Sequence, residues 1–148
     1  MEALAWEFAE RAHGAQVDKD GAPYLDHVRR VVERVRTLAP AEHVPDAVVV
    51  AILHDAVEDS SITLRDLSDV GFADTVVRAV DSVTRRDGED YADLIERAAS
   101  DPVGRWVKLA DNLDNSDEAR LARLDEATAR RLRQKYSVAR RRLTRLDD

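Results

Sequence analysis

Residues 48–59 read VVVAILHDAVED, an apolar run that passes directly into two pairs of polar residues. The run is apolar on every side of a helix, which is typical of a central helix packed against several neighbours. We therefore predict a buried helix over 46–57. Helical spacing would line its C-terminal end with His54, Asp55, Glu58 and Asp59.

Most other segments also repeat apolar residues at helical spacing, and the 5 glycines and 4 prolines fall between them. This pattern predicts an all-α chain. Besides 46–57, the expected helices cover about 2–12, 23–38, a short segment to residue 67 after the N-cap Thr63, 73–84, part of 87–101, 102–115, and a last helix from about 126.

The last helix places Leu132, Tyr136, Ala139, Leu143 and Leu146 on one face. Such a stripe can pair with a second copy of the chain, which is the homodimer alternative. Because the seam covers barely three heptads, we favour packing on the chain's own helices. The opposite, arginine-rich face is interpreted as a solvated surface.

The composition fits one folded domain over residues 1–148, with 44% hydrophobic and 36% charged residues. The absence of cysteine excludes disulfides, thiolate metal ligands and a cysteine nucleophile. No apolar run is long enough for a transmembrane helix, and the acidic N-terminal segment does not resemble a signal peptide. We therefore expect a soluble, cytoplasmic protein that does not enter a membrane.

The net charge of −7 is unevenly distributed. Residues 1–119 contain 13 basic and 26 acidic residues, whereas 120–148 contain 10 basic and 4 acidic residues. Nucleic-acid binding is driven by dense positive charge, so the acidic body argues against a nucleic-acid polymer as partner. An excess of carboxylates is compatible with a site for a divalent cation.

The polar end of the 46–57 segment is unusual because burying a histidine and carboxylates is costly without compensating charge. No basic residue lies between Arg36 and Arg65 to supply that charge locally. A divalent cation is one compensator. The alternative is a helix end that emerges into solvent, although acids there face the negative end of the helix dipole.

A second polar stripe lies in VKLADNLDN, residues 107–115. Lys108, Asp111, Asn112 and Asn115 share one helix face. Its carboxylate could complete a metal site, and its amides suit a nucleotide. Taken alone, the stripe is that of an ordinary amphipathic helix.

Considered together, His27, His54–Asp55 and Asp111 resemble the HD-domain metal-dependent phosphohydrolases. The segments HGAQVDKDGAPYLDH (13–27), AILHDAVEDSSIT (51–63), VTRRDGEDY (83–91) and VKLADNLDN (107–115) are similar to the hydrolase domain of the RelA/SpoT family, above all to its small stand-alone members, including metazoan ones. The resemblance covers about residues 4–116, and 117–148 match more loosely as a closing helical segment. It implies a helical bundle of the HD-domain type.

The resemblance implies that the family's metal ligands map onto His27, His54, Asp55 and Asp111. In the family the ion is usually Mn²⁺, and ligand type leaves Fe²⁺ and Zn²⁺ open. The family's acid pair maps onto two further residues. Glu58 is expected to orient or deprotonate the attacking water, and Asp59 to assist it or to handle the proton of the leaving group.

The resemblance also implies contacts with the substrate. Lys19 matches a lysine that holds phosphate, Asn115 matches an asparagine near the nucleotide, and Tyr24 is expected to shape the pocket wall. Lys108 is also counted among the residues that could bind substrate, although we favour a role in which it pairs with Asp111 or Glu58. His13 also matches a common position and is interpreted as structural.

Two residues depart from the family pattern. Asp18 stands where many members have an arginine that lies against the guanine base, and Asp114 replaces the usual histidine. Both add negative charge near a site for polyanions. We expect weaker discrimination between guanine and adenine, unless Asp18 points away into solvent.

The implied reaction is the removal of the 3′-pyrophosphate from (p)ppGpp, which yields GDP or GTP and pyrophosphate. One alternative keeps the metal and changes the substrate, as in an NADPH 2′-phosphatase. A second alternative is a non-catalytic module that binds a nucleotide or a partner protein. The presence of both Glu58 and Asp59 argues against that module, because a binder needs only the ligands.

Overall fold

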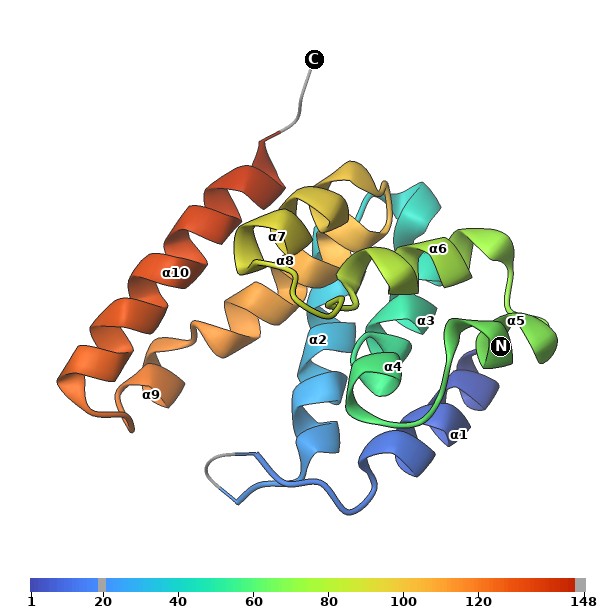
Figure 1. Cartoon of the computed structure of the whole chain (residues 1–148), viewed down its shortest axis with the longest axis horizontal. Helices are drawn as coiled ribbons and strands as arrows, with labels where there is room; N and C mark the ends of the chain where they lie inside the picture. The colour runs from blue at the N-terminus through green and yellow to red at the C-terminus, as the bar shows by residue number, and fades with distance from the viewer. Residues whose placement is uncertain (19–20, 146–148) are drawn as a thin grey trace.

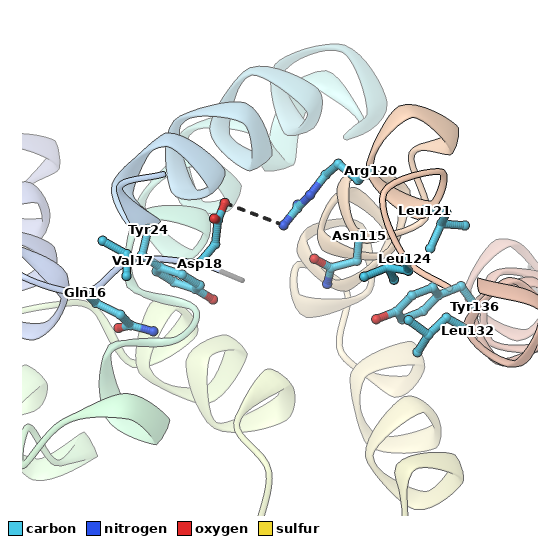
Figure 2. Close-up of a pocket in the computed structure, with 10 residues that line it drawn as sticks. All are labelled: Gln16, Val17, Asp18, Tyr24, Asn115, Arg120, Leu121, Leu124, Leu132 and Tyr136. Atoms are coloured by element: carbon cyan, nitrogen blue, oxygen red, sulfur yellow. Dashed lines mark ion pairs between the residues drawn. The ribbon is translucent and has the colours of Figure 1, made fainter. Parts of the chain in front are cut away.

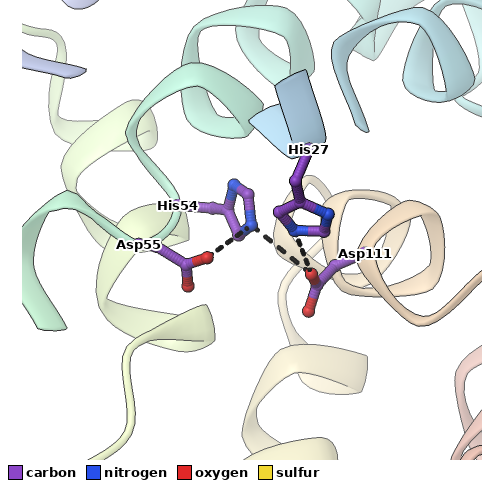
Figure 3. A group of neighbouring side chains, drawn as sticks. All are labelled: His27, His54, Asp55 and Asp111. Carbon is purple, nitrogen blue, oxygen red and sulfur yellow. Dashed lines mark hydrogen bonds and ion pairs between the residues drawn. The ribbon is translucent and has the colours of Figure 1, made fainter. Parts of the chain in front are cut away.

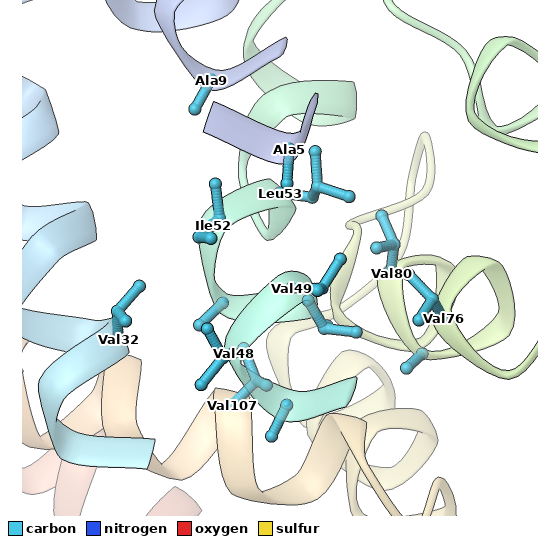
Figure 4. Packing of buried hydrophobic residues seen from close by; sticks show 14 of the residues in the cluster. Ala5, Ala9, Val32, Val48, Val49, Ile52, Leu53, Val76, Val80 and Val107 are labelled. Carbon is cyan, nitrogen blue, oxygen red and sulfur yellow. The ribbon is translucent and has the colours of Figure 1, made fainter. Parts of the chain in front are cut away.

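The apolar run at residues 48–53 lies at the centre of the protein in the computed structural model, which describes residues 1–18 and 21–145. It belongs to α3, which packs against α1, α2, α6 and α8 and is therefore apolar on all sides (Figures 1 and 4). The elements in chain order are α1 (Glu2–His13), α2 (Tyr24–Leu38), the 3₁₀ helix η1 (Ala41–His43), α3 (Val44–Leu53), α4 (Ala56–Asp59), α5 (Leu64–Asp69), α6 (Asp74–Val83), α7 (Tyr91–Ser100), α8 (Gly104–Asn115), α9 (Glu118–Leu121) and α10 (Glu126–Thr144).

The predicted all-α architecture is confirmed. The described residues form helices and no strand, with one isolated bridge between Val17 and Pro23. Thr63 caps α5 as predicted, because its side chain accepts from the backbone N–H of Asp66 while the Asp66 carboxylate accepts from that of Thr63. The short elements η1 and α9 were not predicted, since a single helical turn carries no readable periodicity.

The prediction of one continuous helix over 46–57 is wrong in its second half. α3 ends at Leu53, His54 and Asp55 form a turn, and α4 begins at Ala56. Asp55 has φ −110° and ψ 0°, in the sparsely populated region between helix and strand where many active-site residues lie. The bend means that the polar pairs no longer share one helix face.

The apolar stripe of α10 packs within the chain. Ala139 and Leu143 are buried, and α10 contacts α7 and α8 along the side of the bundle (Figure 1). Asn112 of α8 accepts a hydrogen bond from Arg140 (3.1 Å) and donates one to the Tyr136 carbonyl (3.0 Å). These contacts agree with the intramolecular interpretation of the stripe, whose last member, Leu146, lies outside the described residues.

None of the helices in the described part of the chain combines the length and apolar character that a membrane span requires.

Ile52 provides a direct test of this core. Its side chain is fully buried in α3, so Ile52→Ala is expected to lower the free energy of unfolding by about 2–5 kcal/mol through lost apolar contact and a residual cavity. Val138→Ala is the control, because Val138 is 50% exposed and its loss should cost less than about 0.5 kcal/mol. Urea denaturation measures both. Equal effects would show that α3 is not the centre of the core.

Candidate metal centre

Four side chains from distant parts of the chain meet beside the bend after α3. His27 comes from α2, His54 and Asp55 from the bend, and Asp111 from α8 (Figure 3). One ligand atom from each lies within 4.8 Å of all the others. His27 Nε2 is 3.0 Å from Asp111 Oδ1, and His54 Nε2 is 3.0 Å from Asp55 Oδ2 and 3.5 Å from Asp111 Oδ1.

The bend itself orients His54. The Nδ1 atom of His54 lies 2.6 Å from the Ala51 carbonyl oxygen. A carbonyl only accepts, so Nδ1 donates a proton to it, and Nε2 is the ring nitrogen that faces the carboxylates. Nε2 is buried and has no hydrogen-bond partner among the described residues. A buried ring nitrogen without a hydrogen-bond partner beside two carboxylates is the arrangement a cation would complete.

The charge balance also fits a cation. Burial raises the pKa of Asp55, but the adjacent His54 outweighs it and holds that pKa at about 2. Burial likewise raises the pKa of Asp111, but the Lys108 ammonium and the contact with His27 hold it well below its usual range. Both carboxylates are therefore ionised. Two imidazoles and two carboxylates form a nitrogen and oxygen donor set suited to a divalent transition metal.

Lys108 is the only lysine or arginine that forms an ion pair with this group among the described residues. Its Nζ lies 3.3 Å from Asp111 Oδ2, and the predicted pairing with Asp111 is confirmed. Burial lowers the pKa of Lys108, but Asp111 and Asp55 outweigh it and hold that pKa above its ordinary value. The positive charge that balances the buried acids is absent from the neighbouring sequence and is supplied instead by Lys108 of α8.

Glu58 and Asp59 are not part of the four-residue group. The Glu58 carboxylate accepts from the backbone N–H of Arg85 (2.8 Å), whereas Asp59 Oδ2 lies 3.8 Å from His13 Nδ1. The two acids therefore point to different flanks of α4, contrary to the expectation that they share a face with His54 and Asp55. Burial, followed by the Asp55 charge, raises the pKa of Asp59, and burial also raises that of Glu58.

A cavity of about 310 Å³ lies next to this group, and Figure 2 shows the residues that line the cavity. Tyr24 and Asn115 connect the two. The Tyr24 hydroxyl donates to Asp55, and Asn115 Nδ2 donates to Asp111 Oδ1 (3.1 Å). The cavity is lined by Gln16, Val17, Asp18, Tyr24, Asn115, Arg120, Leu121, Leu124, Leu132 and Tyr136.

The loop before α2 holds the remaining predicted substrate contacts. Lys19 lies outside the described residues. Asp18 does not point away into solvent, as the alternative expected. Its side chain is 11% exposed, accepts from the Ala22 N–H (3.0 Å) and lies 4.0 Å from Arg120 Nη2. His13 is buried with its ring centroid 4.8 Å from that of Tyr24, and its Nδ1 lies 2.8 Å from the Gln16 side-chain oxygen.

The sequence interpretation missed the role of Asp114 and its arginine partners. Asp114 Oδ2 lies 2.6 Å from His27 Nδ1, and its carboxylate also accepts from Arg30 and Arg120. Burial raises the pKa of Asp114, but hydrogen bonds from His27 and Arg30 hold it at about 2. The negative charge that Asp114 adds is therefore compensated by these arginine partners. The one available signal was its position three residues after Asp111, nearly on the same helix face.

Comparisons with known proteins show which proteins this chain resembles. The chain is 34% identical over 119 residues to a guanosine-3′,5′-bis(diphosphate) 3′-pyrophosphohydrolase of Aquifex aeolicus, covering 75% of this chain and 16% of the relative. It is 34% identical over 143 residues to a probable GTP pyrophosphokinase of Mycobacterium leprae, covering 90% and 18%. It therefore spans less than a fifth of the length of these relatives.

Two shorter relatives are matched over more of their length. The human guanosine-3′,5′-bis(diphosphate) 3′-pyrophosphohydrolase MESH1 is 38% identical over 122 residues, which cover 75% of this chain and 65% of the relative. A solved structure, described as a metazoan ortholog of SpoT that hydrolyses ppGpp and plays a role in starvation responses, matches with a TM-score of 0.71 and 25% identity, covering 96% of this chain and 82% of that one. The HD domain family model matches residues 5–144. This chain, with its helical bundle and its His/Asp group, belongs to the HD domain family.

Proposed function

We propose that this protein is a metal-dependent phosphohydrolase that removes the 3′-pyrophosphate of (p)ppGpp. The observation that carries the proposal is the group of His27, His54, Asp55 and Asp111 beside a cavity. Tyr24 and Asn115 of the cavity wall bond directly to two members of the group, so a nucleotide in the cavity would reach it. The activity in the names of the Aquifex and human relatives supports this choice of substrate.

We further propose Mn²⁺ as the resident ion, with Fe²⁺ and Zn²⁺ as alternatives, held by the two imidazoles and two carboxylates. Such an ion supplies a Lewis acid that polarises a phosphoryl oxygen and makes a water molecule more acidic.

Glu58 is proposed to accept a proton from the attacking water, and Asp59 to assist or to return a proton to the leaving oxygen. The water oxygen bonds to phosphorus while the bond from phosphorus to the ribose 3′-oxygen breaks. Pyrophosphate keeps the water oxygen, and the ribose regains its hydroxyl. The different partners of the two acids, the Arg85 N–H for Glu58 and His13 for Asp59, suit two separate proton transfers.

The proposed partner is one small nucleotide, not a nucleic-acid polymer. A cavity of about 310 Å³ lies at the lower end of the range for small-molecule sites. Asn115 is proposed to contact the nucleotide, Tyr24 to form the wall, and Lys19 to hold phosphate. Lys108 is proposed to act on the substrate phosphate only indirectly, because its ammonium group is paired with Asp111.

The test is a substrate panel. Metal-free protein is reconstituted with Mn²⁺ and incubated separately with ppGpp, pppGpp, ppApp, NADPH and deoxynucleotides, and the products are identified. Release of pyrophosphate from ppGpp supports the proposal. Phosphate release from NADPH alone would instead assign a 2′-phosphatase, and turnover of no substrate by metal-loaded protein would favour a binding module.

Asp18 provides a test of base selection. Because its carboxylate faces Arg120 at the cavity, Asp18→Arg removes a charge that repels phosphates and adds a group that can stack on a purine. We expect the KM for ppGpp to fall by roughly two- to fivefold, the size of an exposed cation–π contact, with little change in kcat. The effect should shrink at high salt.

Asp18→Asn is the matched control. It keeps an acceptor for the Ala22 N–H and removes only the charge, so it should lower KM for ppGpp and ppApp equally. Only the arginine variant should favour guanine. Unchanged KM values for both nucleotides in both variants would leave base selection to other cavity residues.

A further inference from the structure

Asp114 is the most enclosed carboxylate near the metal-ligand group, with a side chain that is only 2% exposed. Three groups lie within hydrogen-bonding distance of it, and Arg34 Nε lies further away, 3.9 Å from Oδ1. His27 Nδ1 lies 2.6 Å from Oδ2, Arg30 Nε lies 2.8 Å from Oδ1, and Arg120 Nη1 lies 2.8 Å from Oδ2. Arg30 Nη2 makes a second contact with Oδ2 at 3.2 Å.

These contacts determine which ring nitrogen of His27 carries a proton. A carboxylate held by two arginines is ionised and can only accept, so the 2.6 Å contact requires a proton on Nδ1. The opposite ring atom, Nε2, faces Asp111 Oδ1 at 3.0 Å, inside the metal-ligand group. A neutral His27 with Nδ1 protonated therefore presents its Nε2 lone pair to that group.

The two arginines hold the carboxylate rather than the imidazole. Arg30 lies three residues after His27 on α2, and Arg120 lies on α9, just beyond the α8 helix that carries Asp114. Their side chains are 45% and 25% exposed, so each keeps contact with water while its head group binds the buried acid. Asp114 thereby links the ligand-bearing face of α2 to the end of α8.

We infer that Asp114 is a positioning residue for the metal centre: it fixes the ring orientation and tautomer of His27, and Arg30 and Arg120 fix Asp114. The inference rests on the metal site of the proposed function. A carboxylate behind a ligating imidazole holds the ring in place and makes its free nitrogen a stronger donor. Asp114 is not among the residues that line the cavity of about 310 Å³.

The first experiment measures metal affinity. Wild type and Asp114→Asn are stripped of metal and titrated with Mn²⁺ by calorimetry, well below the unfolding temperature. An amide can turn its NH₂ group toward Nδ1 and favour the wrong tautomer at nearly unchanged shape. We expect the Kd for Mn²⁺ to rise by about 10–100-fold, the usual cost of losing such a partner.

Asp117→Asn is the matched control. It removes the same charge three residues further on, where the carboxylate caps α9 by accepting from Arg120 N–H (3.3 Å). It should bind Mn²⁺ within about threefold of wild type. Equal affinities of wild type and folded Asp114→Asn would overturn the inference. Failure of the wild type to bind any divalent ion would overturn the metal site and the proposed function with it.

A second measurement needs no variant. In ¹⁵N-labelled wild-type protein loaded with diamagnetic Zn²⁺, long-range ¹H–¹⁵N correlation spectra of His27 should show the proton on Nδ1, slowly exchanging because of the bond to Asp114. A ring protonated on Nε2 instead would contradict the inference, even if Asp114→Asn failed to fold.

Discussion

Replacing His54 with alanine is expected to abolish metal binding and turnover together. The substitution removes the imidazole whose buried Nε2 faces both carboxylates of the group. Residues that merely orient a ligand are worth about 10–100-fold in metal affinity, so loss of the ligand itself should weaken Mn²⁺ binding by more than about 100-fold. Calorimetric titration and a pyrophosphate-release assay measure the two effects.

His43→Ala is the control for this substitution, since it removes a histidine of η1 outside the metal-ligand group. It should retain both metal and activity. Circular dichroism should show that both variants are folded. Retention of near-normal Mn²⁺ affinity by folded His54→Ala would exclude His54 as a ligand and remove the basis of the proposed reaction.

Glu58→Gln is expected to separate binding from chemistry. Glutamine keeps an oxygen that can accept from the Arg85 N–H, so the local structure should survive, and Glu58 is not among the four proposed ligands. The glutamine side chain, unlike a carboxylate, cannot take a proton from water. Turnover should fall by about 10²–10⁴-fold, the usual contribution of a general base, while the Kd for Mn²⁺ stays within about threefold.

Asp59→Asn identifies which acid is the base. Asp59 lies on the other flank of α4, near His13, and its proposed part is secondary. We expect a smaller loss of turnover than in Glu58→Gln. If Asp59→Asn lost more activity and Glu58→Gln remained near normal, the two roles would have to be exchanged.

Much of the fold could be predicted from local patterns because helix formation and burial leave short-range signals. The apolar residues of α3 indicated a central helix, and Thr63, as an N-cap residue, indicated a helix start. The prediction of a continuous helix failed at the bend after α3, where the backbone leaves the helical conformation through a small change in its dihedral angles. The bend at His54 and Asp55 interrupts a sequence with no glycine or proline, so nothing local marked it.

The candidate site was likewise predictable from local sequence in one respect and not in another. The sequence alone predicted which residues form the candidate ligand group, because the motifs around His27, His54–Asp55 and Asp111 resemble those of a known family. Only the tertiary structure decided the surroundings of that group. His27 and Asp114 are 87 positions apart, and the charge that balances the buried acids comes from Lys108 on another helix. Buried polar groups must find partners wherever helix packing brings them, and packing between distant helices is not encoded in any single segment.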